Sequence, residues 1–123
     1  MKFAEADIDG GFLIQAYGPG RVVINERAYT EGLIVSPEQI INGWGPETMS
    51  GLSAEHFEAL VALSPQVIIL GTGARQTFPD PSLYVGIMER RIGLEVMDTG
   101  AACRTYNILV SEGRRVVAGL MLA

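Results

Sequence analysis

Short apolar segments separated by glycine and proline occupy the first third of the chain. Residues 12–17 and 21–25 are β-prone runs, and a glycine-proline-glycine sequence at 18–20 stands between them. Glycine and proline between two such runs favour a β-hairpin. A third strand is expected over 31–36, and a long loop without clear periodicity follows over 38–51.

The strongest pattern in the chain is the apolar run 67–70, in which three of four residues are β-branched. The run ends in Gly71 and Gly73, so it fits a buried strand that passes into a tight loop. An amphipathic helix is expected before it, from the N-cap Ser53 to Pro65. Because a buried strand needs cover on both faces, we interpret 67–70 as the central strand of a sheet.

Helices and strands alternate through the second half. The expected elements are a helix over 80–91, a strand over 94–97, a helix over 101–111 and a strand over 116–122. Gly93 is expected to cap the first of these helices, and Thr99 is expected to begin the second as its N-cap. This β-α-β-α-β order is typical of an α/β fold, and the hairpin adds antiparallel strands. The chain is therefore expected to form a mixed sheet covered by helices.

Composition limits the class of protein. With 123 residues and 48% hydrophobic content, the chain suits one domain, 1–123, with one core. No apolar run approaches the ~20 residues that cross a bilayer, and residues 1–7 do not resemble a secretory or transit signal. With these features and a single cysteine, we expect a cytoplasmic protein without membrane insertion. The net charge of −5 and the scattered basic residues disfavour nucleic acid as a partner.

Three segments, 67–76, 97–107 and 108–114, resemble one known family, and Trp44 and Pro46 in the long loop strengthen the resemblance. The chain is similar to the Mth938-like family, also called the DUF498 domain, which includes assembly factor 3 of mitochondrial respiratory complex I. The resemblance covers nearly the whole chain. It implies a three-layer α/β fold in which a central mixed sheet is flanked by helices, with an N-terminal β-hairpin. It implies no established enzymatic activity, and the mitochondrial members act through protein partners.

The loop after the strand 67–70 is the first candidate site. Gln76 stands where a G-x-G-x-x-G fingerprint needs its third glycine, and no Gly-Lys-Ser/Thr sequence is present, so the match to a nucleotide fingerprint is weak. We interpret the loop either as a tight turn or as a cradle for an anion in which Arg75 supplies the charge.

The helix start at Thr99 is the second candidate. It reaches the same sheet edge as the glycine loop if the strands 67–70 and 94–97 are parallel neighbours. Backbone N–H groups at this helix start could bind a small anion, or water and Asp98 could satisfy them. The candidate ligand-binding residues are Gly71, Thr72, Gly73, Arg75, Thr99 and Arg104.

Two further residues have both a structural and a functional interpretation. Cys103 falls on the apolar stripe of its helix and is expected to be buried, unless the fold pairs it with His56 as a nucleophile. Trp44 is either a core residue under the long loop or a contact for a protein partner. No spacing of cysteine, histidine or acidic residues indicates a metal site, and no cofactor is expected.

The sequence leaves two hypotheses for the function. The first is a non-enzymatic protein-interaction or assembly-factor-like protein with an unidentified protein partner, and self-association is left open. The alternative is a binder of a small molecule or anion, or an enzyme, that uses the loop 71–76 and the helix start at Thr99. Because the sequence contains no complete catalytic set, the first function is favoured.

Overall fold

A computed structural model describes residues 11–122, so the expectation about residues 1–7 lies outside the described part of the chain. Two β-sheets are present. The smaller is antiparallel throughout and contains β1 (Ile14–Gly18), β2 (Arg21–Ile24) and β3 (Arg27–Tyr29). The larger contains β4 (Leu33–Val35), β5 (Ile40–Asn42), β6 (Val67–Thr72), β7 (Gly93–Met97) and β8 (Val116–Met121).

The larger sheet is mixed, with the strand order β5-β4-β8-β6-β7. Strand β6 pairs in parallel with both β7 and β8, whereas β4 pairs antiparallel with β5 and β8. The predicted buried strand is β6, and all six of its residues are buried. The middle position, however, belongs to β8, which joins the antiparallel and parallel halves of the sheet.

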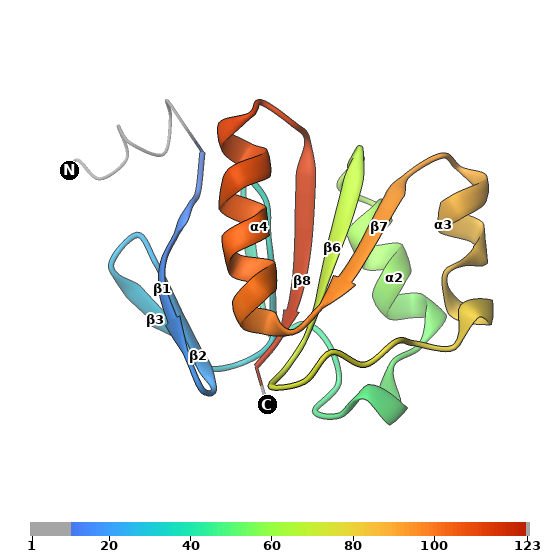
Figure 1. The fold of residues 1–123 in the computed structure, drawn as a ribbon, viewed down its shortest axis with the longest axis horizontal. Coiled ribbons are helices and arrows are strands. Elements are labelled where there is room, and N and C mark those ends of the chain that lie inside the picture. Colours follow the sequence, from blue (N-terminus) through green and yellow to red (C-terminus); the bar gives the residue numbers. More distant parts are fainter. Residues whose placement is uncertain (1–10, 123) are drawn as a thin grey trace.

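Helices cover both faces of the larger sheet (Figure 1). They are α2 (Ala54–Val61), α3 (Val85–Glu89) and α4 (Thr99–Ser111), with 3-10 turns η1 (Met49–Gly51) and η2 (Pro81–Leu83). Alternate residues of β6 serve different faces. Ile69 packs in a cluster with residues of α4 and the smaller sheet, whereas Ile68 packs in a second cluster with residues of α2 and α3. The predicted three-layer α/β fold with an N-terminal hairpin is confirmed.

Helix α4 also ties the smaller sheet to the rest of the fold. The side chain of Asn107 accepts a hydrogen bond from the backbone N–H of Ile14 and donates one to the carbonyl of the same residue, both at 2.8 Å. The hydroxyl of Tyr106 donates to the carbonyl of Phe12 at 2.7 Å. These bonds fix β1 alongside α4, and they thereby fix where the tip of the β1–β2 hairpin lies.

Two short strands fall where the sequence predicted none. Strand β3 follows β2 through a two-residue turn at Asn25 and Glu26, whose φ angles are 54° and 66°. Positive φ at both residues is the geometry of a tight hairpin, but glutamate gives no sequence signal for it. Strand β5 lies within the segment 38–51, which was expected to be a loop, and it is too short to show a period.

The predicted helix over 80–91 is wrong in its extent. Its first residues form η2, and only the five-residue α3 is α-helical. Gly93 is not a cap, because it is already the first residue of β7. The turn after α3 is made instead by Arg91, which has a φ of 62°. The helix is short enough that Val85 and Met88, two of its apolar residues, remain exposed.

Candidate functional site

The carboxyl ends of β6, β7 and β8 meet at one edge of the larger sheet, as their parallel pairing requires. The chain leaves β6 toward α3 on one face and leaves β7 toward α4 on the opposite face. Connections that diverge in this way open a crevice at the carboxyl ends of neighbouring strands, where open α/β sheets bind ligands. The predicted meeting of the glycine loop and the Thr99 helix start at one edge is therefore confirmed.

Thr99, the first residue of α4, forms hydrogen bonds to the loop after β6 and to the end of β8 at this edge. Its Oγ1 accepts a hydrogen bond from the backbone N–H of Gly73 at 2.8 Å and donates to the carbonyl of Met121 at 2.6 Å. Its own backbone N–H donates to the carbonyl of Gly73 at 2.9 Å. The side chain is buried, so the crevice has a rigid floor in which the polar groups of Thr99 are already used.

The residue that caps α4 is Asp98, and the prediction of Thr99 as N-cap is wrong. The carboxylate of Asp98 accepts a hydrogen bond from the backbone N–H of Ala101 at 2.9 Å, and Asp98 has the extended conformation of a cap residue. Thr99 cannot serve as the cap because its hydroxyl is committed to Gly73 and Met121. A carboxylate therefore stands at the helix start, where a bound anion would have to lie.

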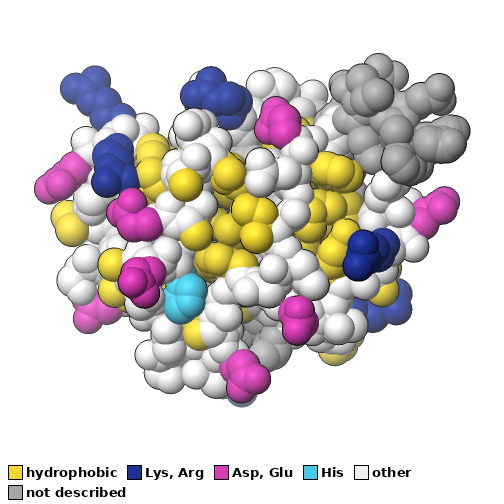
Figure 2. Space-filling model, turned by 180° about the vertical axis from the view of Figure 1, so that it is seen from behind, with side chains coloured by type: hydrophobic (Ala, Val, Ile, Leu, Met, Phe, Trp, Pro, Cys, Tyr) yellow, Lys and Arg dark blue, Asp and Glu magenta, His cyan; other side chains and the backbone are white. Residues whose placement is uncertain are grey.

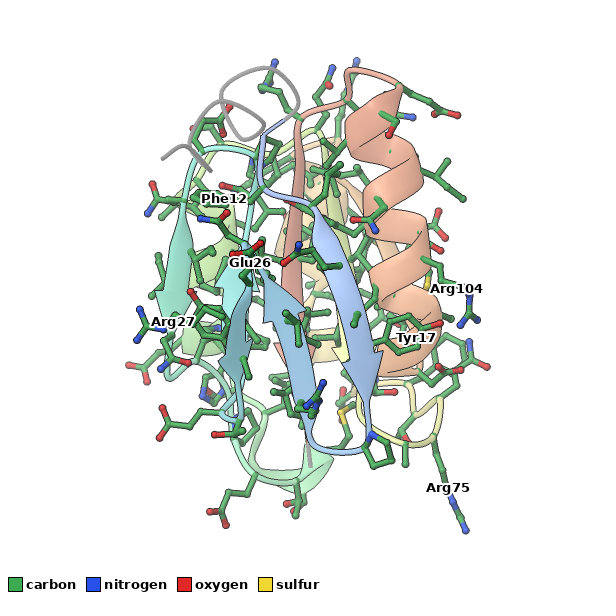
Figure 3. The ribbon with its side chains drawn as sticks, turned by 90° about the vertical axis from the view of Figure 1, so that its left-hand side faces the viewer. Phe12, Tyr17, Glu26, Arg27, Arg75 and Arg104 are labelled. Atoms are coloured by element: carbon green, nitrogen blue, oxygen red, sulfur yellow. The ribbon has the colours of Figure 1, made fainter. Side chains whose placement is uncertain are left out.

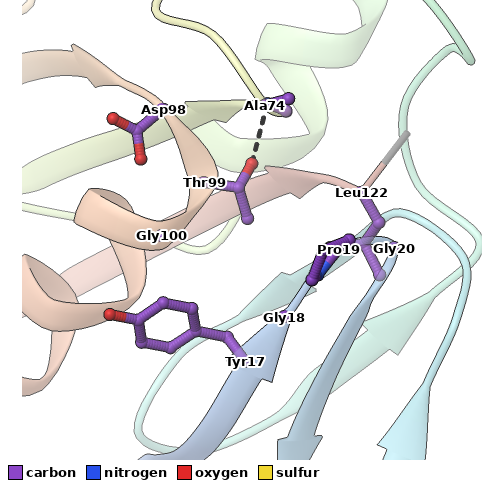
Figure 4. A pocket seen from close by; sticks show the side chains of 10 residues that line it. Tyr17, Gly18, Pro19, Gly20, Ala74, Asp98, Thr99, Gly100 and Leu122 are labelled. Atoms are coloured by element: carbon purple, nitrogen blue, oxygen red, sulfur yellow. Dashed lines mark hydrogen bonds between the residues drawn. The ribbon is translucent and has the colours of Figure 1, made fainter.

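A cavity of about 340 Å³ lies in the crevice, and we call it the crevice cavity (Figure 4). Three parts of the chain enclose it: the tip of the β1–β2 hairpin, the ends of β6 and β8, and the start of α4. It is lined by Tyr17, Gly18, Pro19, Gly20, Gly73, Ala74, Asp98, Thr99, Gly100 and Leu122. Most of this lining is apolar, with one carboxylate among its side chains.

Of the six candidate ligand-binding residues, only Gly73 and Thr99 line the crevice cavity. Gly71 and Thr72 are buried within β6. The hydroxyl of Thr72 donates to the carbonyl of Met97 and accepts from the backbone N–H of Thr77, both at 3.2 Å, so it organises the loop rather than facing a ligand. The tight-turn interpretation of this loop fits these contacts.

The two candidate arginines lie outside the cavity. Arg75 is exposed, and Figure 3 shows its side chain extended away from the body of the molecule. Arg104 donates a hydrogen bond to the hydroxyl of Tyr17, and its guanidinium lies 5.8 Å from the centre of that ring. This contact raises the pKa of Arg104 above its ordinary value and fixes the charge at the rim.

The hairpin tip is the part of the site that sequence reasoning missed. Tyr17 and Pro19 lie more than fifty positions before Gly73, and nothing local indicates that they meet it. The pairing of Asn107 with β1 brings them there, and an isolated asparagine on a helix gives no signal for such a contact.

A family model described as "Protein of unknown function (DUF498/DUF598)" matches residues 14–121. The chain belongs to the DUF498 family. It is 33% identical over 123 residues to a Danio rerio protein named NADH dehydrogenase (ubiquinone) 1 alpha subcomplex assembly factor 3, with 98% of this chain and 70% of that protein covered. It is 28% identical over 117 residues to the "13 kDa major membrane protein" of Francisella tularensis, with 94% and 95% covered.

Solved structures support the same assignment. A Bordetella parapertussis protein superimposes with a TM-score of 0.85 at 34% identity, covering 91% of this chain and 96% of that protein. A Bordetella pertussis protein described as a Mth938-like domain superimposes with a TM-score of 0.80 at 28% identity, covering 92% and 87%. The family predicted from the sequence is thereby confirmed. Within residues 11–122, no helix of this DUF498 domain has the length and apolar character that a bilayer crossing requires.

Trp44 belongs to the core of the DUF498 domain. Its side chain is only 6% exposed, and its indole N–H donates to the carbonyl of His56 at 3.1 Å. The ring packs over β8 at Gly119, where an added Cβ would lie 2.7 Å from Cη2. A partner cannot reach this side chain in the folded domain, so its core interpretation, rather than direct partner binding, fits the structure.

Cys103 and His56 do not form a nucleophilic pair. Cys103 is buried in the cluster between α4 and the sheet, whereas His56 is in α2 on the opposite face. Burial raises the pKa of the Cys103 thiol to about 12, which disfavours the reactive thiolate. Among residues 11–122, no group of three histidine, cysteine or acidic side chains could hold a metal ion.

We expect Cys103 to be protected from thiol reagents in the folded state. Labelling by a disulfide reagent at pH 8 should be more than about a hundredfold slower than in urea, because reaction requires opening of the core. At neutral pH the thiol is protonated in both the folded and the unfolded state. Because burial raises its folded pKa above the unfolded value of 9.0, ionisation favours the unfolded state, and the free energy of unfolding should fall as the pH rises from about 9 to about 12.

Cys103→Ala is the control for the alkaline effect. Its free energy of unfolding should fall less steeply over that pH range than that of the unmodified protein. The buried Tyr106 hydroxyl, whose pKa is also raised by burial, contributes equally to both proteins. Equal pH slopes, or rapid labelling of the folded protein, would contradict a buried protonated thiol.

Proposed function

We propose that this DUF498 domain is a non-enzymatic, assembly-factor-like protein that binds a protein partner beside the edge strand β7. The observation that carries the proposal is a group of exposed apolar side chains in the segment 78–88. Phe78 is 67% exposed, Met88 is 61% exposed and Val85 is 52% exposed. Large apolar side chains that gather on a surface mark interaction sites more often than scattered ones do. The assembly-factor name of the Danio rerio relative supports a role through protein partners.

Two of these exposed side chains, Phe78 and Met88, line two hollows. One, of about 300 Å³, is lined by Phe78, Tyr84, Met88, Ile92, Gly93, Leu94 and Val96. The other, of about 440 Å³, shares Phe78 with the first and is lined by Met49, Ser50, Leu52, Phe78, Pro79, Asp80, Ser82 and Leu83. Figure 2, seen from behind the view of Figure 1, shows hydrophobic side chains across the middle of that face, whereas α3, which lies at the right of Figure 1, falls toward the left margin of this view. We call the two hollows and the edge of β7 the partner surface.

Strand β7 supplies a polar component to the partner surface. It pairs with β6 on one side, and within residues 11–122 no strand pairs with its other side. An extended segment of another protein can add to such an edge through main-chain hydrogen bonds while its alternate side chains fill flanking apolar hollows. Glu95 on β7 is exposed and the chain carries a net charge of −5. The occupant we propose is therefore an extended apolar segment of a different protein that also carries lysine or arginine.

A capture experiment with matched variants tests this proposal. The double variant Phe78→Asp/Met88→Asp should recover about tenfold less of the stoichiometric partner from the native host than the unmodified domain does, because it places charge in both hollows. The control is Ile108→Asp, which changes a side chain that is 56% exposed on α4, on the opposite face.

Three results decide the capture experiment. Loss of the partner with the double variant alone supports the partner surface. Loss with the Ile108→Asp control alone would move the interface to α4. Recovery of no stoichiometric partner by the unmodified domain would count against the interaction role itself.

The proposed interaction takes place in the cytoplasm, as the composition suggested. The relative from Francisella tularensis is named a major membrane protein, so a partner at a membrane surface is the main competing location. Fractionation of the native host distinguishes the two locations, because recovery of the chain with washed membranes would contradict the cytoplasmic assignment.

A further inference from the structure

We propose that the crevice cavity binds one small, uncharged organic molecule whose surface is mainly apolar. This proposal does not depend on the partner surface, which is built from the segment 78–88 and β7. The cavity is instead enclosed by the hairpin tip, the ends of β6 and β8 and the start of α4. Its position is the crevice at the carboxyl ends of parallel strands, which is the general ligand position of open α/β sheets.

The cavity is built from rigid parts. Thr99 joins Gly73 to Met121 across its floor through two side-chain hydrogen bonds. The hairpin wall is held by the paired hydrogen bonds between Asn107 and Ile14. A volume of about 340 Å³ is at the lower end of the range of about 300–1,000 Å³ that small-molecule pockets occupy. A preformed cavity of this size suits a molecule with one ring.

The lining selects against charged molecules. Among the ten lining residues, Asp98 is the only acidic one and none is basic. One oxygen of its carboxylate already accepts from Ala101, and Figure 4 shows the carboxylate at the margin of the cavity rather than at its centre. Inside the cavity an anion would meet the Asp98 carboxylate and no basic lining residue, because Arg75 lies in solvent and Arg104 stays outside the lining, at the rim beside Tyr17.

The interior favours apolar contact. The ring of Tyr17, the ring of Pro19 and the side chain of Leu122 lie around the cavity in Figure 4. The hydroxyl of Thr99 is used on both its donor and acceptor sides, so a ligand meets its methyl group and not a free polar atom. An apolar molecule with a single polar group loses no strong hydrogen bond to the site and displaces water from apolar surface.

Gly100 sets the width of the cavity between α4 and the hairpin. A Cβ at this position would lie 3.1 Å from Cε1 of Tyr17, which forces the ring to shift. Gly100→Ala is also favourable for helix α4, since alanine has the higher helix propensity. The matched control is Gly86→Ala in α3, where an added Cβ meets nothing within 4 Å.

Benzyl alcohol and benzoate are the probes, because they share a ring and differ in charge. Titration of the isotope-labelled domain with benzyl alcohol should shift the amide resonances of Gly20, Gly73 and Gly100 saturably at one site. Benzoate should not shift them at the same concentrations. Binding should weaken about tenfold or more in Gly100→Ala and remain unchanged in Gly86→Ala.

A second variant keeps the test independent of helix α4. Ala74→Phe adds a ring from an exposed position in the loop after β6 and should also abolish binding. The proposal is overturned if benzyl alcohol causes no saturable shift at the cavity amides, or if both cavity variants bind it as the unmodified domain does. Equal binding of benzoate would overturn the uncharged class. None of these results bears on the capture experiment, because the two cavity variants, Gly100→Ala and Ala74→Phe, leave the lining of the two hollows unchanged.

Discussion

Trp44→Ala is expected to lower the free energy of unfolding by about 3–5 kcal/mol, the usual cost of removing a buried tryptophan side chain. The ring fills the space between the long loop and the middle strand, where the backbone at Gly119 approaches it. Its removal also leaves the carbonyl of His56 without its indole donor. Urea denaturation monitored by circular dichroism measures the change.

Trp44→Phe separates the contribution of ring packing from that of the hydrogen bond to His56. Phenylalanine keeps much of the apolar contact with Gly119 but cannot donate a hydrogen bond to His56. Trp44→Phe should therefore lower the free energy of unfolding clearly less than Trp44→Ala does. A loss below about 1 kcal/mol for Trp44→Ala would show that the side chain is not part of the core. Trp44 would then be free to contact a partner directly.

Thr99→Val is expected to cost about 2–4 kcal/mol, because it replaces a hydroxyl by a methyl group of similar size. The backbone N–H of Gly73 and the carbonyl of Met121 would each lose a buried partner, and an unsatisfied buried group costs about 1–3 kcal/mol. The same change loosens the floor of the crevice cavity, so the amide of Gly73 should exchange its hydrogen faster.

Thr99→Ser is the control for this change. Serine keeps both hydrogen bonds and loses only a methyl group, so most of the stability and the protection of the Gly73 amide should remain. If serine and valine destabilised the domain equally, packing of the methyl group and not the hydrogen bonds would hold this edge together.

The sequence predicted the elements whose signals are local. The local sequence alone is enough to predict the apolar strand β6 and the glycine-proline-glycine turn of the hairpin. The sheet to which each strand belongs is not local information. Strand β4 follows the hairpin in sequence, yet it pairs with β8 more than eighty positions later. Burial on both faces marked β6 as interior, but β8 is buried to the same degree and occupies the middle.

The candidate site was predicted in position but not in composition. The edge shared by Gly73 and Thr99 follows from parallel strands, and it is where the structure places both residues. Arg75 was expected to supply charge at this edge, but its side chain extends into solvent, and the sequence of an exposed loop gives no sign of the direction of an arginine side chain. Asp98 and Thr99 are both good capping residues, and the long-range bonds of the Thr99 hydroxyl to Gly73 and Met121 leave Asp98 as the cap.

The middle position of β8 has a consequence for how the protein forms during its synthesis. Strands β4 and β5 leave the ribosome early and β6 and β7 later, but the larger sheet cannot join these pairs until β8 emerges. Until then, the edges of β4 and β6 that β8 will cover are unpaired and apolar, which is the condition under which nascent chains aggregate or recruit chaperones. Release of the last strand is thus the event that commits the chain to its native topology.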